Sequence, residues 1–142
     1  MIFYVDTSVL VASLSAERRT AAAQAWLGAQ APGTIAISEW TLVEIASALS
    51  IKERSGDLTA AERARADQLW LKIRLEHTRI VALNGTHFAL ATRFASQSAS
   101  ELRGGDALHL AVAADRGLSL ATFDDRMANG ARSLGIAIAD FR

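Results

Sequence analysis

The chain has 142 residues, of which 51% are hydrophobic, and it contains no cysteine. This composition excludes a disordered segment, a disulfide framework and thiolate chemistry. Basic and acidic residues number 15 each, so the net charge is zero and any affinity for nucleic acid must come from a local basic patch. The length predicts one domain, residues 1–142, with a core of its own.

Short apolar runs rich in β-forming residues alternate with helical patterns along the whole chain. Strands are expected at residues 2–5, 34–37, 79–82, 118–121 and 136–138. Helices are expected at residues 9–14, 21–27, 39–54, 59–77, 86–98, 106–116 and 124–134. This alternation predicts an α/β fold, in which a mostly parallel sheet of four to five short strands carries helices on both faces.

Two features argue against export and against a membrane location. The first six residues lack a basic region and end in Asp6, which is unlike a signal peptide. The longest run without charge, residues 20–38, contains Pro32, glycines and glutamines, which is unlike a membrane span. We therefore expect a cytoplasmic protein with no membrane partner.

An almost wholly apolar helix is predicted after Arg103, and Asp106 opens it behind two glycines. A helix that is apolar on nearly every side belongs in the centre of a domain. Because free N–H groups and the helix dipole favour a carboxylate in the first turn, helix capping alone explains an isolated Asp106. Three further acids lie at the ends of elements that converge on it, and together they support a functional site.

Two of these acids follow predicted strands. Asp6 comes directly after the first strand and Asp124 shortly after the fourth. Ligands of parallel sheets bind beyond the carboxyl ends of the strands, so both acids face one crevice if the fourth strand pairs with the first on the side away from the second. A turn or cap is the alternative for each acid, and Asp125 can replace Asp124.

Glu44 lies within the helix that follows the second strand. Its neighbours one turn away are Thr41, Ser47 and Ala48, which are small and leave room above the carboxylate. An ordinary solvated position is the alternative. Glu39 is a rival acid on the same helix, but its first-turn position is explained by the helix dipole.

Several carboxylates in one crevice repel each other, and a cation offsets this cost. A site built from carboxylate oxygens suits Mg²⁺ or Mn²⁺ rather than structural Zn²⁺. The chemistry that follows is metal-assisted hydrolysis of a phosphodiester.

Four short motifs resemble those of PIN-domain nucleases, and most closely VapC-type toxins of bacterial toxin–antitoxin pairs. They occur in the order typical of that family and span nearly the whole chain, at its single-domain length. The motifs are Val5–Asp6–Thr7–Ser8, Val43–Glu44–Ile45, Asp106–Ala107–Leu108–His109–Leu110–Ala111 and Thr122–Phe123–Asp124–Asp125–Arg126–Met127.

The resemblance implies a three-layer PIN-like sandwich and a ribonuclease that depends on Mg²⁺ or Mn²⁺. It also implies a homodimer silenced by a small antitoxin whose tail enters the active site. Asp6 and Asp106 would be the principal metal ligands, and Glu44 and Asp124 would complete the acidic pocket. The hydroxyls at Thr7, Ser8 and Thr122 would hold a water on the metal or orient Asp6.

Other polar and aromatic residues are assigned from their local context. Arg103 and Arg126 flank the acidic motifs and are the candidate contacts to RNA. His109 lies one turn after Asp106, where a hydrogen-bonded core histidine is favoured over a catalytic base. His77 and His87 lie at helix ends and carry no functional signal. The tryptophans are interpreted as core or dimer contacts rather than base-stacking platforms; they are Trp26, Trp40 and Trp70.

Two other functions compete with a ribonuclease. A degenerate PIN fold could hold RNA or a protein partner without cutting, although four intact acids argue against this. A metal-dependent phosphohydrolase of small substrates would need a closed pocket with specific contacts, for which the sequence offers no motif.

Overall fold

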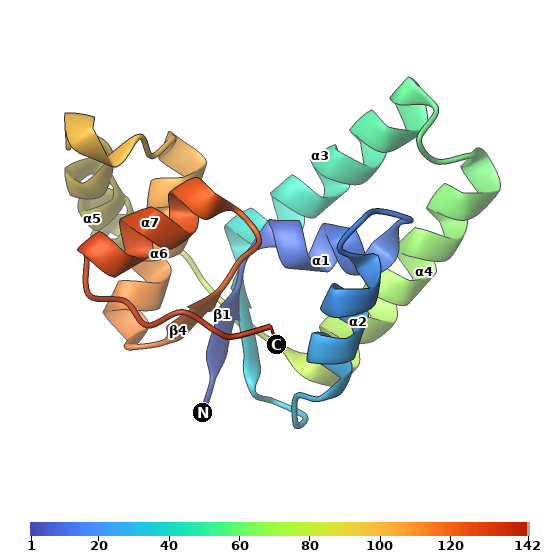
Figure 1. The fold of residues 1–142 in the computed structure, drawn as a ribbon, viewed down its shortest axis with the longest axis horizontal. Coiled ribbons are helices and arrows are strands. Elements are labelled where there is room, and N and C mark those ends of the chain that lie inside the picture. Colours follow the sequence, from blue (N-terminus) through green and yellow to red (C-terminus); the bar gives the residue numbers. More distant parts are fainter. Residues whose placement is uncertain (142) are drawn as a thin grey trace.

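The computed structural model describes residues 1–141, and its centre is a four-stranded sheet between two layers of helices (Figure 1). Every pair of neighbouring strands is parallel, and the order is β3-β2-β1-β4. The fourth strand therefore pairs with the first on the side away from the second, as a shared crevice requires. The strands are β1 (Phe3–Val5), β2 (Ile35–Ser38), β3 (Thr78–Val81) and β4 (Ser119–Ala121).

The helices follow the predicted pattern with shifted ends. They are α1 (Thr7–Leu14), α2 (Thr20–Gly28), α3 (Glu39–Ser55), α4 (Ala60–His77), α5 (Gly85–Ala95), α6 (Gly104–Arg116) and α7 (Asp125–Ser133). Helix α5 ends earlier than expected and a 3-10 turn, Ser98–Ser100, follows it. None of these helices is long and apolar enough to cross a membrane.

The expected fifth strand at residues 136–138 is reduced to a bridge. Leu120 pairs in parallel with Ile138, and the Leu120 backbone exchanges hydrogen bonds of 2.7 Å with Ala137 and Ala139. The four regular strands confirm the predicted α/β sandwich, within the range of four to five strands.

Alternation along the strands builds two cores, one on each face of the sheet. Tyr4 and Ala36 point to the face covered by α5, α6 and α7. Val5, Ile35 and Ile37 point to the opposite face, which is covered by α1, α2, α3 and α4. The edge strand β3 is partly exposed, but β1, β2 and β4 are largely buried, so polar side chains near these three strands meet solvent mainly at the strand ends.

The apolar stripe of α3 is narrower than the sequence suggests. Ile45 and Leu49 are buried and Leu42 is partly buried, but Ala46, which belongs to the same predicted stripe, is exposed. Helices α3 and α4 form a hairpin that projects beyond the sheet (Figure 1). Only a narrow side of α3 therefore meets the rest of the domain.

Candidate active site

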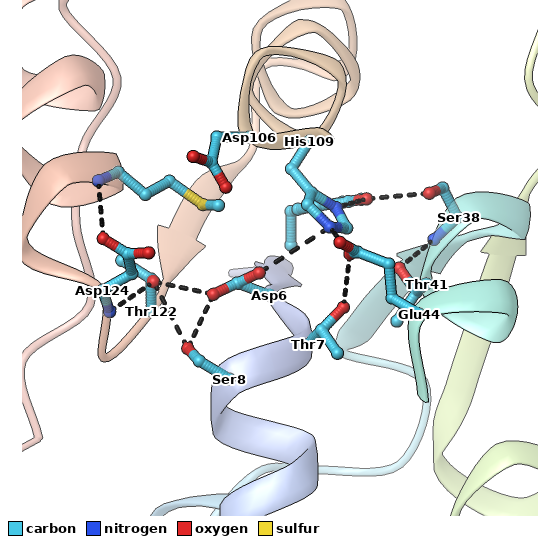
Figure 2. A network of polar contacts seen from close by, with 12 residues as sticks. Asp6, Thr7, Ser8, Ser38, Thr41, Glu44, Asp106, His109, Thr122 and Asp124 are labelled. Atoms are coloured by element: carbon cyan, nitrogen blue, oxygen red, sulfur yellow. Dashed lines mark hydrogen bonds and ion pairs between the residues drawn. The ribbon is translucent and has the colours of Figure 1, made fainter. Parts of the chain in front are cut away.

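The carboxyl ends of β1 and β4, the second turn of α3 and the first turn of α6 place four acids around one region (Figure 2). Asp6 follows β1, and Asp124 is the N-cap of α7 after β4. Asp106 lies in the first turn of α6, and Glu44 lies in the second turn of α3. All four residues come from motifs singled out in the sequence.

Asp6 is the most deeply placed of the four, with 4% of its surface exposed. Its Oδ2 accepts hydrogen bonds from Ser8 Oγ at 2.6 Å and Thr122 Oγ1 at 2.9 Å. Its other oxygen, Oδ1, lies 3.7 Å from Nε2 of His109. The two hydroxyls therefore occupy one carboxylate oxygen and direct the other toward the centre of the cluster.

Glu44 is half-buried, and its Oε1 is held from two sides. Thr7 Oγ1 donates to this oxygen at 2.7 Å, and Nε2 of His109 is hydrogen-bonded to it. Burial by itself raises the pKa of Glu44, but the hydrogen bond and charge of His109, aided by Thr7 and Trp40, lower that pKa below its usual value. Glu44 is therefore held in its charged form.

Asp106 and Asp124 repel each other across the site. Burial raises the pKa of Asp106, the backbone N–H of Arg103 lowers it, and the charges of Asp124 and Asp6 raise it further, so the net shift is upward. The Arg103 N–H donates to Oδ2 of Asp106 at 3.3 Å. The capping interpretation of Asp106 is thus correct, but the same carboxylate also feels two other acids.

Asp124 caps the N-terminus of α7 and also belongs to the acidic cluster. Its Oδ1 accepts from the backbone N–H groups of Arg126 at 2.9 Å and Met127 at 3.2 Å. Its charge acts on Asp106, whereas Asp125 is exposed at the start of α7. The geometry therefore favours Asp124 over Asp125 as the fourth acid.

His109 is a buried, hydrogen-bonded histidine, as predicted, but it also belongs to the acidic cluster. It is 1% exposed, and single ligand atoms of Asp6, Glu44 and His109 all lie within 4.8 Å of one another. Sequence reasoning missed its partner Tyr4, whose hydroxyl lies 2.7 Å from Nδ1. Two sequence features could have suggested this pair: a single histidine in an otherwise apolar helix, and a tyrosine hydroxyl in the buried strand β1.

The other histidine and aromatic assignments have mixed outcomes. His87 is fully buried, and its Nε2 lies 2.8 Å from Oδ2 of Asp115, a contact that its helix-end position did not suggest. Trp26 packs on Phe3 with ring centroids 5.2 Å apart, and Trp40 and Trp70 are partly buried against the two cores, which confirms core roles. Arg103 and Arg126 are exposed beside Asp106 and Asp124.

The donor set fits a hard divalent cation. Carboxylate oxygens are the ligands that Mg²⁺ and Mn²⁺ prefer, and Asp6 Oδ1 is directed into the cluster. Burial and the charges of Asp124 and Asp6 raise the pKa of Asp106, and a cation would offset this cost of holding it ionised. Among the described residues, Asp6, Glu44 and His109 bring ligand atoms within 4.8 Å of one another, and Asp106 and Asp124 add negative charge beside them.

Comparison with known proteins places the fold. The PIN domain family model matches residues 3–133. VapC20 of Mycobacterium tuberculosis, described as a toxin that cleaves the sarcin–ricin loop, is 20% identical with a TM-score of 0.73, covering 96% of this chain and 98% of that one. FitAcB of Neisseria gonorrhoeae is 17% identical with a TM-score of 0.71, covering 99% and 98%.

A third similar structure is a complex. VapBC2 of Rickettsia felis, bound to a DNA fragment from its promoter, is 14% identical with a TM-score of 0.66, covering 98% of this chain and 98% of that one. No curated protein sequence is significantly similar to this chain. At these identities the solved structures establish a common fold, and the family model covers most of the sequence. The chain belongs to the PIN domain family.

Proposed function

We propose that the protein is an endoribonuclease that depends on Mg²⁺ or Mn²⁺ and acts as the toxin of a toxin–antitoxin pair. The observation that carries this proposal is the cluster of Asp6, Glu44, Asp106 and Asp124 at one end of the sheet in a PIN fold. Metal-assisted hydrolysis of a phosphodiester is the chemistry that such a donor set supports best. The toxin role is supported by similarity to a toxin and to toxin–antitoxin complexes.

Each acid has a role that follows from its surroundings. Asp6 and Asp106 hold the metal, and Glu44 and Asp124 complete the pocket. A bound ion would supply Lewis-acid activation of the phosphate and of water. Ser8 and Thr122 fix the orientation of Asp6, as their hydrogen bonds to Oδ2 indicate. The Asp6 carboxylate is therefore already oriented before an ion binds.

RNA would be held by local charge, because the chain as a whole is neutral. Arg103 and Arg126 are exposed on either side of the acidic pocket, next to Asp106 and Asp124. A guanidinium group can bind phosphate oxygens with two parallel hydrogen bonds. These two arginines would position the RNA backbone over the metal.

Three further parts of the proposal concern the protein's surroundings. A small antitoxin is the proposed protein partner, because solved toxin–antitoxin complexes from Rickettsia felis and Klebsiella pneumoniae share the fold. A homodimer is proposed because large apolar side chains remain exposed on the described residues. A cytoplasmic location is proposed, because a ribonuclease toxin would meet its RNA substrate there.

Cleavage of a structured RNA by the purified protein tests the chemistry. We expect cutting with Mn²⁺ and none with EDTA, and we expect Asp6→Asn and Asp106→Asn each to abolish it, since each removes a charged ligand at constant volume. Asp125→Asn is the control, because that neighbouring acid lies outside the cluster. Binding of RNA without cutting in Mn²⁺ would support a non-cleaving module instead.

Expression in a bacterial host tests the biological role. Wild-type protein should stop growth, Asp6→Asn should not, and co-expression of a small protein encoded beside the gene should restore growth. Harmless expression of wild-type protein that is folded and loaded with metal would contradict the toxin role, while leaving the nuclease assignment to the cleavage assay.

A further inference from the structure

A buried chain of hydrogen bonds reaches Glu44 from the core; its members are Ser38, Tyr4, His109 and Glu44 (Figure 2). The Tyr4 hydroxyl is bonded to Ser38 Oγ at 2.9 Å and to Nδ1 of His109 at 2.7 Å. Tyr4 and Ser38 are fully buried. Buried polar groups are costly unless they are hydrogen-bonded, so this chain has a defined arrangement.

The protons in this chain are constrained by chemistry. A carboxylate oxygen accepts hydrogen bonds, so Nε2 of His109 carries the hydrogen in its bond to Oε1 of Glu44. The other ring nitrogen is held by Tyr4. The imidazole therefore cannot turn without breaking both bonds, and its Nε2–H points at one oxygen of Glu44.

The two oxygens of Glu44 have different surroundings. Oε1 accepts from Thr7 and from His109. Oε2 faces the first turn of α6, where a Cβ on Gly105 would lie 3.4 Å from it. Nε2 of His109 contacts both Oε1 of Glu44 and Oδ1 of Asp6, so Oε1 is the oxygen that lies beside Asp6. The hydrogen bonds to Oε1 thus fix the orientation of the Glu44 carboxylate.

We propose that His109 is a positioning residue, held by Tyr4 and Ser38, whose bond to Oε1 holds the Glu44 carboxylate beside Oδ1 of Asp6 at the metal pocket. This inference rests on the proposed metal site. Mutating a group that orients a metal-binding side chain typically costs about 10- to 100-fold in metal affinity. His109 acts through Glu44, so its effect must vanish when Glu44 can no longer bind metal.

The chain contains a matched control for a purely structural role. His87 is also fully buried, with Nε2 on Asp115 Oδ2 at 2.8 Å and Nδ1 accepting from Asn84 N at 3.2 Å. It joins α5 to α6 at the opposite end of α6 from Asp106. Losing either histidine removes a buried histidine–carboxylate contact, but only His109 touches Glu44.

Titration with Mn²⁺, followed by the electron paramagnetic resonance signal of the free ion, tests this role. We expect His109→Leu to raise the Mn²⁺ dissociation constant about 10- to 100-fold. His109→Gln, whose amide N–H can replace Nε2–H, should recover most of the affinity. Tyr4→Phe should weaken binding less than His109→Leu. His87→Leu should lower the melting temperature and leave the dissociation constant unchanged.

A double-mutant cycle with Glu44→Gln isolates the path through Glu44. Adding His109→Leu to Glu44→Gln should cause no further loss of Mn²⁺ affinity. Independent losses that multiply would overturn the proposal, and so would an equal effect of His87→Leu. Failure of the wild-type protein to bind Mn²⁺ would overturn the proposed function and this inference together, whereas binding without coupling overturns the inference alone. If His109→Leu does not fold, Tyr4→Phe in both backgrounds decides.

Discussion

At the scale of single residues, Asp106 carries the clearest electrostatic penalty. Its pKa is raised above the ordinary value of 3.8 by burial and by the charges of Asp124 and Asp6, against the lowering effect of the Arg103 N–H. A carboxyl with a raised folded pKa binds its proton more tightly in the folded state. The free energy of unfolding therefore falls as the pH rises from 3.8 through the raised pKa.

Asp106→Asn should consequently stabilise the metal-free protein at neutral pH. The amide oxygen still accepts from the Arg103 N–H, so the helix cap is retained while the charge is lost. We expect a higher melting temperature than wild type in EDTA at pH 7, and a difference that shrinks as the pH falls toward 4. Lower melting at both pH values would mean that the carboxylate mainly caps α6.

With Mn²⁺ bound, wild type should melt at a higher temperature than Asp106→Asn, which reverses the order expected in EDTA. Mn²⁺ at a hundredfold excess over its dissociation constant stabilises a one-site protein by about 2.7 kcal/mol. We expect wild type to show most of this gain and Asp6→Asn and Asp106→Asn to lose it. Asp125→Asn, which alters an exposed acid outside the cluster, should gain as much as wild type. Equal shifts in all four proteins would show that these acids form no common metal site.

Asp6, Asp106 and Asp124 were predictable because each follows a strand or opens a helix whose end is marked by the sequence, whereas Glu44 was singled out within its helix by its small neighbours. The role of His109 was only half predictable, for a physical reason. Its ring meets Tyr4, 105 residues away in the chain, and no local pattern records such a contact. The neighbours of Glu44 were also judged along its own helix, whereas Thr7 and His109 reach it from α1 and α6.

At the scale of elements, the types and order of the helices and strands followed from periodicity, and the errors lie at their ends. The expected fifth strand is a bridge because only Leu120 offers its backbone to residues 136–138. The exposed Ala46 shows a second limit. Periodicity identifies an apolar face but not how much of that face finds a partner, and α3 projects beyond the sheet.

The approach of α6 to α3 gives a test at this scale. A Cβ on Gly105 would lie 3.1 Å from Nε1 of Trp40 and 3.4 Å from Oε2 of Glu44, whereas a Cβ on Gly104 would meet nothing within 4 Å. Both glycines gain helix propensity on change to alanine, by up to about 1 kcal/mol. We expect Gly104→Ala to be neutral or stabilising and Gly105→Ala to weaken Mn²⁺ binding by displacing Trp40 and Glu44.

Thermal melting of the two alanine variants measures their stability, and Mn²⁺ titration measures whether the metal affinity has changed. Unchanged Mn²⁺ affinity in Gly105→Ala would show that the Glu44 side of the pocket tolerates a shift of α3. Weakened affinity in both variants would point instead to the first turn of α6, which the two glycines share.

At the scale of the whole molecule, exposed apolar side chains indicate association. Leu69, Leu71 and Leu75 on α4 are 40%, 47% and 72% exposed, on a helix that also carries Trp70 and Ile73. We expect light scattering at tens of micromolar to give twice the mass of 15.2 kDa, and Leu75→Glu to give the single mass. Phe88→Glu, which alters an exposed side chain on α5, should leave the dimer intact. A monomeric wild-type protein at this concentration would contradict the homodimer.

The order of the strands also determines when, during synthesis of the chain, the acidic cluster can assemble. During synthesis β1 emerges first, yet it lies between β2 and β4, and β4 is among the last elements made. Thr122 cannot donate its hydrogen bond to Asp6, and Asp124 cannot approach Asp6, until nearly the entire polypeptide has left the ribosome. An unfinished chain therefore lacks the assembled acidic cluster, which forms only in a late step of synthesis and folding.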